Sequence, residues 1–81
     1  MEFLVKVKVL AFARYRELLG FAETELPLPD PPPTLGELLK HPIFAVLPEN
    51  ALFAINQKFV NGSESIRPGD EIAIMPPVSG G

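Results

Sequence analysis

The alternation of apolar and polar residues changes its period several times along the chain, and each change marks a new element. Within residues 3–11, Val5, Val7 and Val9 alternate with Lys6 and Lys8, and the apolar residues at positions 4 and 10 share the lysine face. A period of two that is rich in β-branched residues predicts a strand with one buried face. The chain therefore opens with a half-buried strand.

The period becomes helical from Phe12 to Leu19. Phe12, Tyr15, Leu18 and Leu19 fall on one stripe of a helix, and Gly20 follows where a left-handed C-terminal cap is expected. This segment is predicted to be a short helix of about two turns.

Residues 21–28 alternate again and predict a second strand, placed at a sheet edge because Pro27 cannot donate to a ladder. After a proline-rich loop, residues 34–40 begin with a threonine in the N-cap position and a glutamate three residues later. That pair fits the capping box and predicts a helix. The apolar run at 43–47 predicts a further helical turn that packs on the core.

The second half of the chain predicts three more strands, at 51–56, 59–60 and 71–75. Asn-Gly at 61–62 and Arg-Pro-Gly-Asp at 67–70 are turn sequences, and the second one fits type II. Because the last strand is apolar on both faces, we expect it to lie in the centre of the sheet or to use one face for docking.

This order of elements predicts an α+β fold of two layers, with helices on one face of a mixed sheet. The first and last strands are expected to pair in parallel at the centre, with the longer helix crossing the sheet. That arrangement is the β-grasp, or ubiquitin-like, fold. We expect one domain at 1–75 and an extended, protruding tail at 76–81.

Composition narrows the function classes. The chain has 81 residues, no cysteine and a net charge of −3, and its seven basic residues are dispersed. Dispersed basic residues argue against a nucleic-acid groove, and the lack of cysteine excludes disulfides and thiolate metal sites. No signal peptide and no apolar run of about 20 residues is present, so we expect a cytoplasmic protein without a membrane segment.

The most distinctive chemistry lies in the ending, which reads Pro76, Pro77, Val78, Ser79, Gly80, Gly81. Two prolines favour a stiff, extended stalk, and glycine has no Cβ, so the end can enter a narrow slot. The body offers one histidine, His41, beside Pro42, where a cap or surface role is more common than a base. No metal-ligand pattern and no nucleophile motif is found, and we expect no metal and no cofactor to be bound by this chain.

Four stretches resemble the small subunit of molybdopterin synthase, the MoaD type of the MoaD/ThiS sulfur carriers. They are residues 8–20, 54–58, 69–71 and 76–81, in the order and spacing of that family. The Pro-Pro-Val-Ser-Gly-Gly ending is the most specific part, because the ThiS type usually lacks the two prolines. The resemblance is weakest across residues 29–50.

The resemblance implies a reaction at Gly81. A MoeB-type adenylyltransferase would use ATP to adenylate the Gly81 carboxylate, and a sulfur donor would convert it to a thiocarboxylate. The tail residues 76–80 would insert into the large, MoaE-type subunit, where the sulfur passes to cyclic pyranopterin monophosphate. The catalytic side chains are then expected on the large subunit, in a heterotetramer of two small and two large subunits.

The same resemblance assigns the partner-docking surface to Phe12, Phe59 and Met75. The family often has an aromatic residue at the last position, and methionine keeps the surface apolar and adaptable. We expect these three side chains to be more exposed than their hydrophobicity suggests.

Three alternatives stay open at this point. The chain could carry sulfur for thiamine synthesis or tRNA thiolation, or it could be a ubiquitin-like modifier joined through Gly81 to lysines. It could also be a plain β-grasp interaction module with an inert tail.

Overall fold

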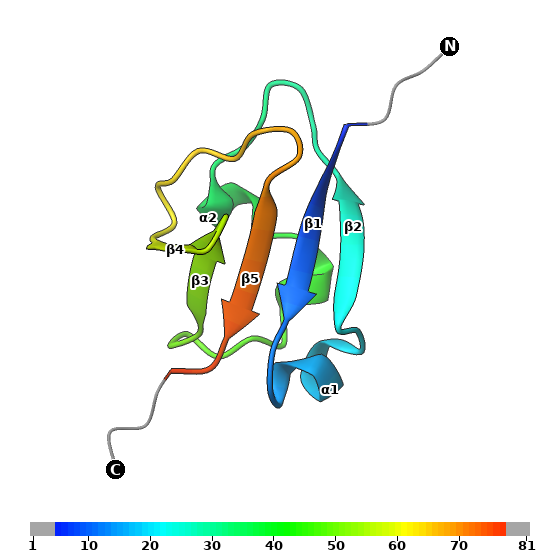
Figure 1. Ribbon diagram of the computed structural model, residues 1–81, viewed down its shortest axis with the longest axis vertical. Helices are drawn as coiled ribbons and strands as arrows, with labels where there is room; N and C mark the ends of the chain where they lie inside the picture. The colour runs from blue at the N-terminus through cyan, green and yellow to red at the C-terminus, as the bar shows by residue number, and fades with distance from the viewer. Residues whose placement is uncertain (1–4, 78–81) are drawn as a thin grey trace.

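The computed structural model describes residues 5–77 and shows a single sheet with helices on one side (Figure 1). The elements of this part of the chain are β1 (Lys6–Ala11), α1 (Tyr15–Leu19), β2 (Glu23–Pro27), α2 (Leu35–Leu38), the 3-10 helix η1 (Pro42–Phe44), β3 (Leu52–Ile55), β4 (Lys58–Val60) and β5 (Glu71–Met75).

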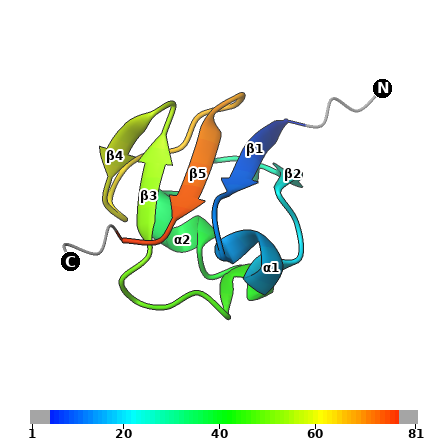
Figure 2. The same cartoon turned by 60° about the horizontal axis from the view of Figure 1, so that its bottom comes forward.

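The last strand lies in the middle of the sheet. The strand order is β2-β1-β5-β3-β4, and β1 and β5 run parallel while every other neighbouring pair is antiparallel. The predicted mixed sheet, the central β5 and the parallel pairing are therefore confirmed. The two parallel strands end at the same edge of the sheet, where the chain leaves toward the tail (Figures 1 and 2).

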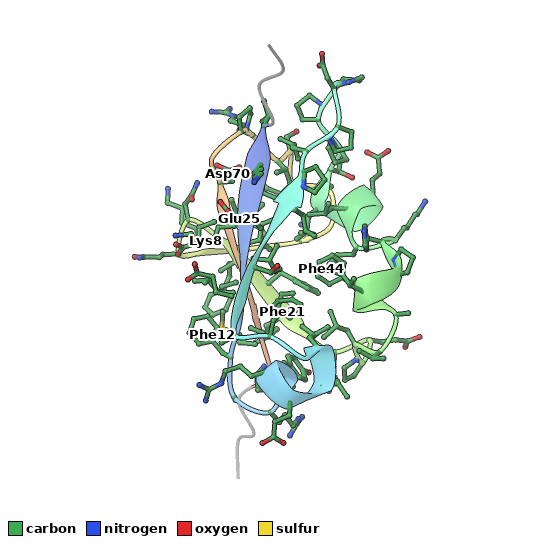
Figure 3. All side chains as sticks on the ribbon, turned by 90° about the vertical axis from the view of Figure 1, so that its right-hand side faces the viewer. Lys8, Phe12, Phe21, Glu25, Phe44 and Asp70 are labelled. Carbon is green, nitrogen blue, oxygen red and sulfur yellow. The ribbon has the colours of Figure 1, made fainter. Side chains whose placement is uncertain are left out.

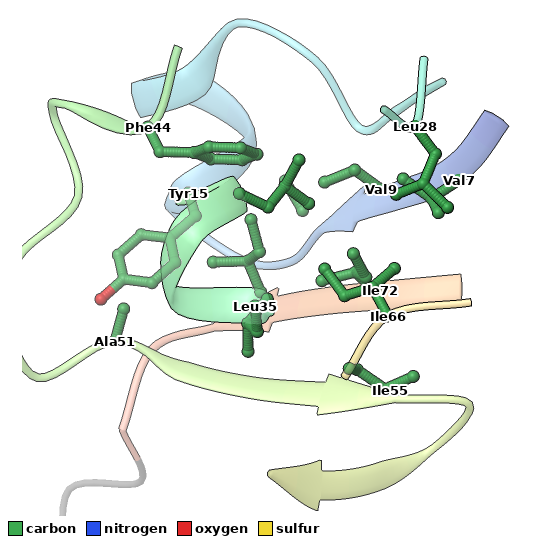
Figure 4. Packing of buried hydrophobic residues seen from close by; sticks show 13 residues of the cluster. Val7, Val9, Tyr15, Leu28, Leu35, Phe44, Ala51, Ile55, Ile66 and Ile72 are labelled. Atoms are coloured by element: carbon green, nitrogen blue, oxygen red, sulfur yellow. The ribbon is translucent and has the colours of Figure 1, made fainter. Parts of the chain in front are cut away.

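The hydrophobic core lies between the sheet and the helices. Viewed along the sheet, Phe21 and Phe44 lie on the side of the helices, which we call the helix face (Figure 3). Lys8 and Phe12 lie on the opposite side, which we call the open face. The core combines strand residues of the helix face with side chains from the covering segments (Figure 4): Val7, Val9, Ile55, Ile72 and Ile74 from the strands, and Tyr15, Leu28, Leu35, Leu38, Phe44 and Ile66 from the cover.

The start of α2 is the capping box that the sequence predicts. The Glu37 backbone N–H donates to Thr34 Oγ1 at 3.3 Å, and the Thr34 backbone N–H donates to Glu37 Oε1 at 2.9 Å. His41 then acts as the cap of η1, because its Nδ1 accepts from the Ile43 backbone N–H at 3.2 Å. Its predicted role as a cap is confirmed.

Two tight turns shape the second half of the sheet. Asn56 and Gln57 join β3 to β4 with φ of 51° and 72°, the left-handed conformation that a type I′ hairpin turn requires at both positions. Gly69 has φ of 83°, and the Asp70 N–H donates to the Arg67 carbonyl at 3.1 Å, as in the predicted type II turn.

Two expectations about the helices were wrong. The first helix begins at Tyr15, and Phe12 lies outside it because Ala13 is left-handed, with φ of 56°. The second helix, α2, has four residues, one fewer than α1, so the expected long helix across the sheet is not found among the described residues. The helix ends ahead of Pro42, which cannot continue it. The first strand is regular only from Lys6, and the predicted part before residue 5 lies outside the described residues.

Candidate functional site

The stalk of the predicted tail begins at the end of the central strand. β5 ends at Met75, and Pro76 and Pro77 follow, partly buried and without regular structure. Since β5 is paired on both sides, by β1 and β3, hydrogen bonds in the centre of the sheet fix the position from which the stalk leaves. The predicted site residues Val78, Ser79, Gly80 and Gly81 lie outside the described residues.

A row of apolar residues crosses the open face. The register places Leu10 beside Ala73, Ala73 beside Ala54, and Ala54 beside Phe59. Side chains of directly opposed residues point to the same face of a sheet. Four strands thus contribute one apolar residue each to a continuous row that ends at Phe59.

A second row lies next to it, nearer to the stalk. Leu52 of β3 is paired with Met75 of β5. Phe12 extends the alternation of β1 by one position, because its backbone N–H donates to the Ile74 carbonyl at 3.0 Å. The β1–β5 register continued by one residue puts Phe12 beside Met75. Phe12, Met75 and Leu52 therefore flank the start of the stalk.

These residues form what we call the apolar patch: Leu10, Phe12, Leu52, Ala54, Phe59, Ala73 and Met75. None of them belongs to the core cluster or packs against it, although Ala54 is almost completely buried. Phe12 is 46% exposed and Phe59 is 70% exposed, so the expected exposure is confirmed for both. Met75 is partly buried. The three residues predicted for docking share one face of the sheet.

The far end of the open face is charged. Lys8 lies between Glu25 of β2 and Glu71 of β5 in the register, and its Nζ is 4.0 Å from Glu23 Oε2. Both members of that pair are well exposed, so the ion pair contributes little to stability. The open face thus has an apolar half next to the stalk and a charged half away from it.

Sequence reasoning missed four members of the apolar patch: Leu10, Leu52, Ala54 and Ala73. The sequence carried a signal for two of them, because Leu10 shares the lysine face of its strand and Ala73 shares a face with Met75. For Leu52 and Ala54 no such signal exists. Only the register of the sheet shows that Leu52 lies beside Met75 and that Ala54 lies beside Phe59.

Other chemistry is sparse among residues 5–77. No group of three or more His, Cys, Asp or Glu side chains that could hold a metal ion is found there. None of the helices described is long and apolar enough to cross a membrane. The Tyr15 hydroxyl is buried and has no hydrogen-bond partner in this part of the chain.

Comparison with known proteins supplies the context for this surface. The model of the ThiS family matches residues 9–81. The molybdopterin synthase sulfur carrier subunit of Arabidopsis thaliana is 40% identical over 81 residues, covering 95% of this chain and 84% of that protein.

Two solved structures are similar as well. A Pyrococcus furiosus protein described as subunit 1 of a molybdopterin converting factor is 30% identical with a TM-score of 0.80, over 91% of this chain and 99% of that one. The SAMP1 protein of Haloferax volcanii is 26% identical with a TM-score of 0.77, over 94% and 99% of the two chains. The expected ubiquitin-like β-grasp fold is thereby confirmed, and the chain belongs to the ThiS family and is related to the molybdopterin synthase sulfur carriers.

Proposed function

We propose that this chain is the sulfur-carrier subunit of molybdopterin synthase. In this role the Gly81 carboxyl carbon is the reacting atom, and the folded body presents it to two partners in turn. The partners are an adenylyltransferase of the MoeB type and the large subunit of the synthase. The catalytic side chains belong to these partners, and the chain itself is a substrate that gains a sulfur atom and then gives it up.

The chemistry at Gly81 follows from the poor reactivity of a carboxylate. An oxygen of the Gly81 carboxylate attacks the α-phosphorus of ATP, and pyrophosphate leaves. The acyl adenylate now has a good leaving group, so a sulfur nucleophile displaces AMP and forms the thiocarboxylate. In the large subunit the sulfur passes to cyclic pyranopterin monophosphate, and a water molecule supplies the oxygen that returns Gly81 to a carboxylate.

One observation carries the proposal: the stalk that leads to the Gly-Gly ending leaves the central strand beside the apolar patch. Met75 belongs to both features, since it ends β5 and lies between Leu52 and Phe12. A partner that covers the patch is thereby aligned with the start of the stalk. Exposed apolar patches on small proteins commonly mark interaction sites. Pro76 and Pro77 then limit the directions that the following residues can take.

The proposal is tested by intact-mass measurement. The chain is incubated with the adenylyltransferase, ATP and a sulfur source, and the expected product has gained the mass difference between sulfur and oxygen. A variant that lacks Gly81 should fold normally and gain no sulfur. Ser63→Ala, which is far from the ending in the sequence, should form the thiocarboxylate as the wild type does. Molybdopterin formation by the truncated chain would contradict the proposal.

The identity of the product requires a second readout. Co-purification with a MoaE-type large subunit, and transfer of the sulfur to cyclic pyranopterin monophosphate, supports the molybdopterin role. A charged chain that transfers sulfur only to a thiamine precursor or to a tRNA would make it a carrier for another product.

The similarity to SAMP1, a name that stands for small archaeal modifier protein 1 in another solved structure, favours one alternative. A modifier would use the same adenylated Gly81, with a lysine amine as the nucleophile in place of sulfur. Mass spectrometry of cell extracts distinguishes the two roles. Peptides with a lysine joined to the Gly81 carboxyl group would favour the modifier.

A further inference from the structure

The turn that follows β1 holds the chain in a conformation that an alanine rarely adopts. Ala13 has φ of 56°, in the left-handed region where non-glycine residues are uncommon. Among the described non-glycine residues with positive φ, Asn56 and Gln57 are explained by their hairpin turn. Ala13 lies in no hairpin; it is the second residue of the turn from Phe12 to Tyr15 that joins β1 to α1.

The hydrogen bonds on either side of Ala13 show what the conformation achieves. The Phe12 N–H donates to the Ile74 carbonyl at 3.0 Å, and the Phe12 carbonyl accepts from the Tyr15 N–H at 3.1 Å. The Arg16 N–H donates to the Ala13 carbonyl at 3.2 Å. Phe12 is thus attached to β5 on one side and to the first turn of α1 on the other.

The left-handed residue also separates two aromatic side chains. In a continuous helix, residues three positions apart share a face, so Phe12 and Tyr15 would both point toward the core. Here Tyr15 is fully buried on the helix face, whereas Phe12 is 46% exposed on the open face (Figures 3 and 4). Phe12 thus stays on the open face, where the pairing of β1 with β5 places it, and the chain turns at a strained position directly after it. Such combinations are found where a side chain is needed for binding.

We propose that Ala13 is a positioning residue, whose left-handed backbone holds Phe12 beside Met75 at the start of the stalk, for contact with the large subunit. The inference rests on the proposed function, because it takes Phe12 to be part of the docking surface. Ala13 itself is exposed and adds no packing to the core. Its contribution is therefore to the direction of the Phe12 side chain.

The test is a set of substitutions at an exposed position that differ in their tolerance of positive φ. Ala13→Gly and Ala13→Asn both adopt the left-handed region readily, and Ala13→Val does not, although asparagine and valine are of similar size. Affinity for the purified large subunit is measured by calorimetry. We expect the glycine and asparagine variants to bind within about twofold of the wild type, and the valine variant to bind about tenfold more weakly.

A double-mutant cycle with Phe12→Ala separates positioning from general destabilisation. If Ala13 acts through Phe12, Ala13→Val weakens binding in the wild-type background and has little further effect in the Phe12→Ala background. Equal losses in both backgrounds would overturn the inference. If Ala13→Val does not fold, Ala13→Leu, which is unbranched at Cβ, replaces it in the cycle.

Amide hydrogen exchange gives a readout in the free protein. The Phe12 amide donates a hydrogen bond to the Ile74 carbonyl. Its protection from exchange should be lost in Ala13→Val and kept in Ala13→Asn. The docking role of Phe12 and the positioning role of Ala13 can be contradicted separately. If Phe12→Ala binds normally, the docking role of Phe12 is wrong and the inference is wrong with it. If Phe12→Ala binds weakly while Ala13→Val binds normally, only the role of Ala13 is wrong.

Discussion

The side-chain amide of Asn56 donates to Asp70 Oδ1 at 2.9 Å and ties the β3–β4 hairpin to the turn that precedes β5. The second carboxylate oxygen of Asp70 accepts from the Arg67 backbone N–H at 2.8 Å, and Asn56 Oδ1 accepts from the Glu71 N–H at 3.0 Å. Asp70 is only 9% exposed. The start of the central strand is therefore fixed by a small, closed polar network.

Removing the carboxylate of Asp70 should destabilise the fold. Asp70→Ala leaves the Asn56 amide and the Arg67 N–H without their acceptor, and unpaired, partly buried donors cost about 1–3 kcal/mol. Urea unfolding measures the change, with Glu49→Ala, at an exposed carboxylate, as the matched control. We expect the control to lie within about 0.5 kcal/mol of the wild type. Equal stability of the two variants would show that the network does not hold β5.

The Tyr15 hydroxyl is expected to contribute nothing to stability. It is buried and has no partner among the described residues, so Tyr15→Phe removes a group whose desolvation is uncompensated. This variant should be as stable as the wild type or more stable, whereas Tyr15→Ala should lose about 3–5 kcal/mol because the ring fills the core. Thermal unfolding of the two variants measures both effects. A marked loss in Tyr15→Phe would contradict this account.

Phe59 offers a test of the apolar patch that is separate from folding. Because its side chain is 70% exposed, Phe59→Ser should cost less than about 1 kcal/mol of stability. Its affinity for the large subunit should fall by about tenfold if the patch is the docking surface. Val46 is 53% exposed and follows η1, in the layer of helices, so Val46→Ser is the matched control and should bind normally. Weaker binding by the control, with normal binding by Phe59→Ser, would place docking on the other side of the molecule.

The capping box makes one contribution to stability depend on pH. Hydrogen bonds from the Thr34 backbone N–H, and then from its hydroxyl, lower the pKa of Glu37 below the ordinary value of 4.5. A lowered pKa in the folded state means that the contribution is present above the ordinary value and is lost as the pH falls through the lowered one. The difference in Tm between the wild type and Glu37→Gln should therefore shrink between neutral pH and about pH 3. A difference that is constant over this range would contradict the assignment.

The sequence predicts those parts of the fold that local patterns determine. Alternation identifies the strands, the proline at position 27 places β2 at an edge, and Gly69 identifies its turn. The start of α1 could not be predicted in the same way, because nothing about an alanine indicates a left-handed backbone at Ala13. The helical spacing of Phe12 and Tyr15 therefore led to a helix that begins three residues too early.

The candidate site was predictable only in part, for a related reason. Phe12, Phe59 and Met75 were named through resemblance to a family, and two of them are strongly exposed as expected. Their common face depends on which strands are neighbours and on the register between them. That information lies in long-range pairing, such as Ala54 with both Ala73 and Phe59, and is absent from any short stretch of sequence.

The central position of β5 also orders events during synthesis on the ribosome. β1 is made early, but its parallel neighbour is the last of the described strands to emerge, more than sixty residues later in the register that pairs Lys8 with Glu71. Until then β1 and β3 each have an unpaired edge, and the sheet remains in two halves. A chain that ends before β5 cannot complete this sheet, so we expect proteases to cleave it faster than the full chain.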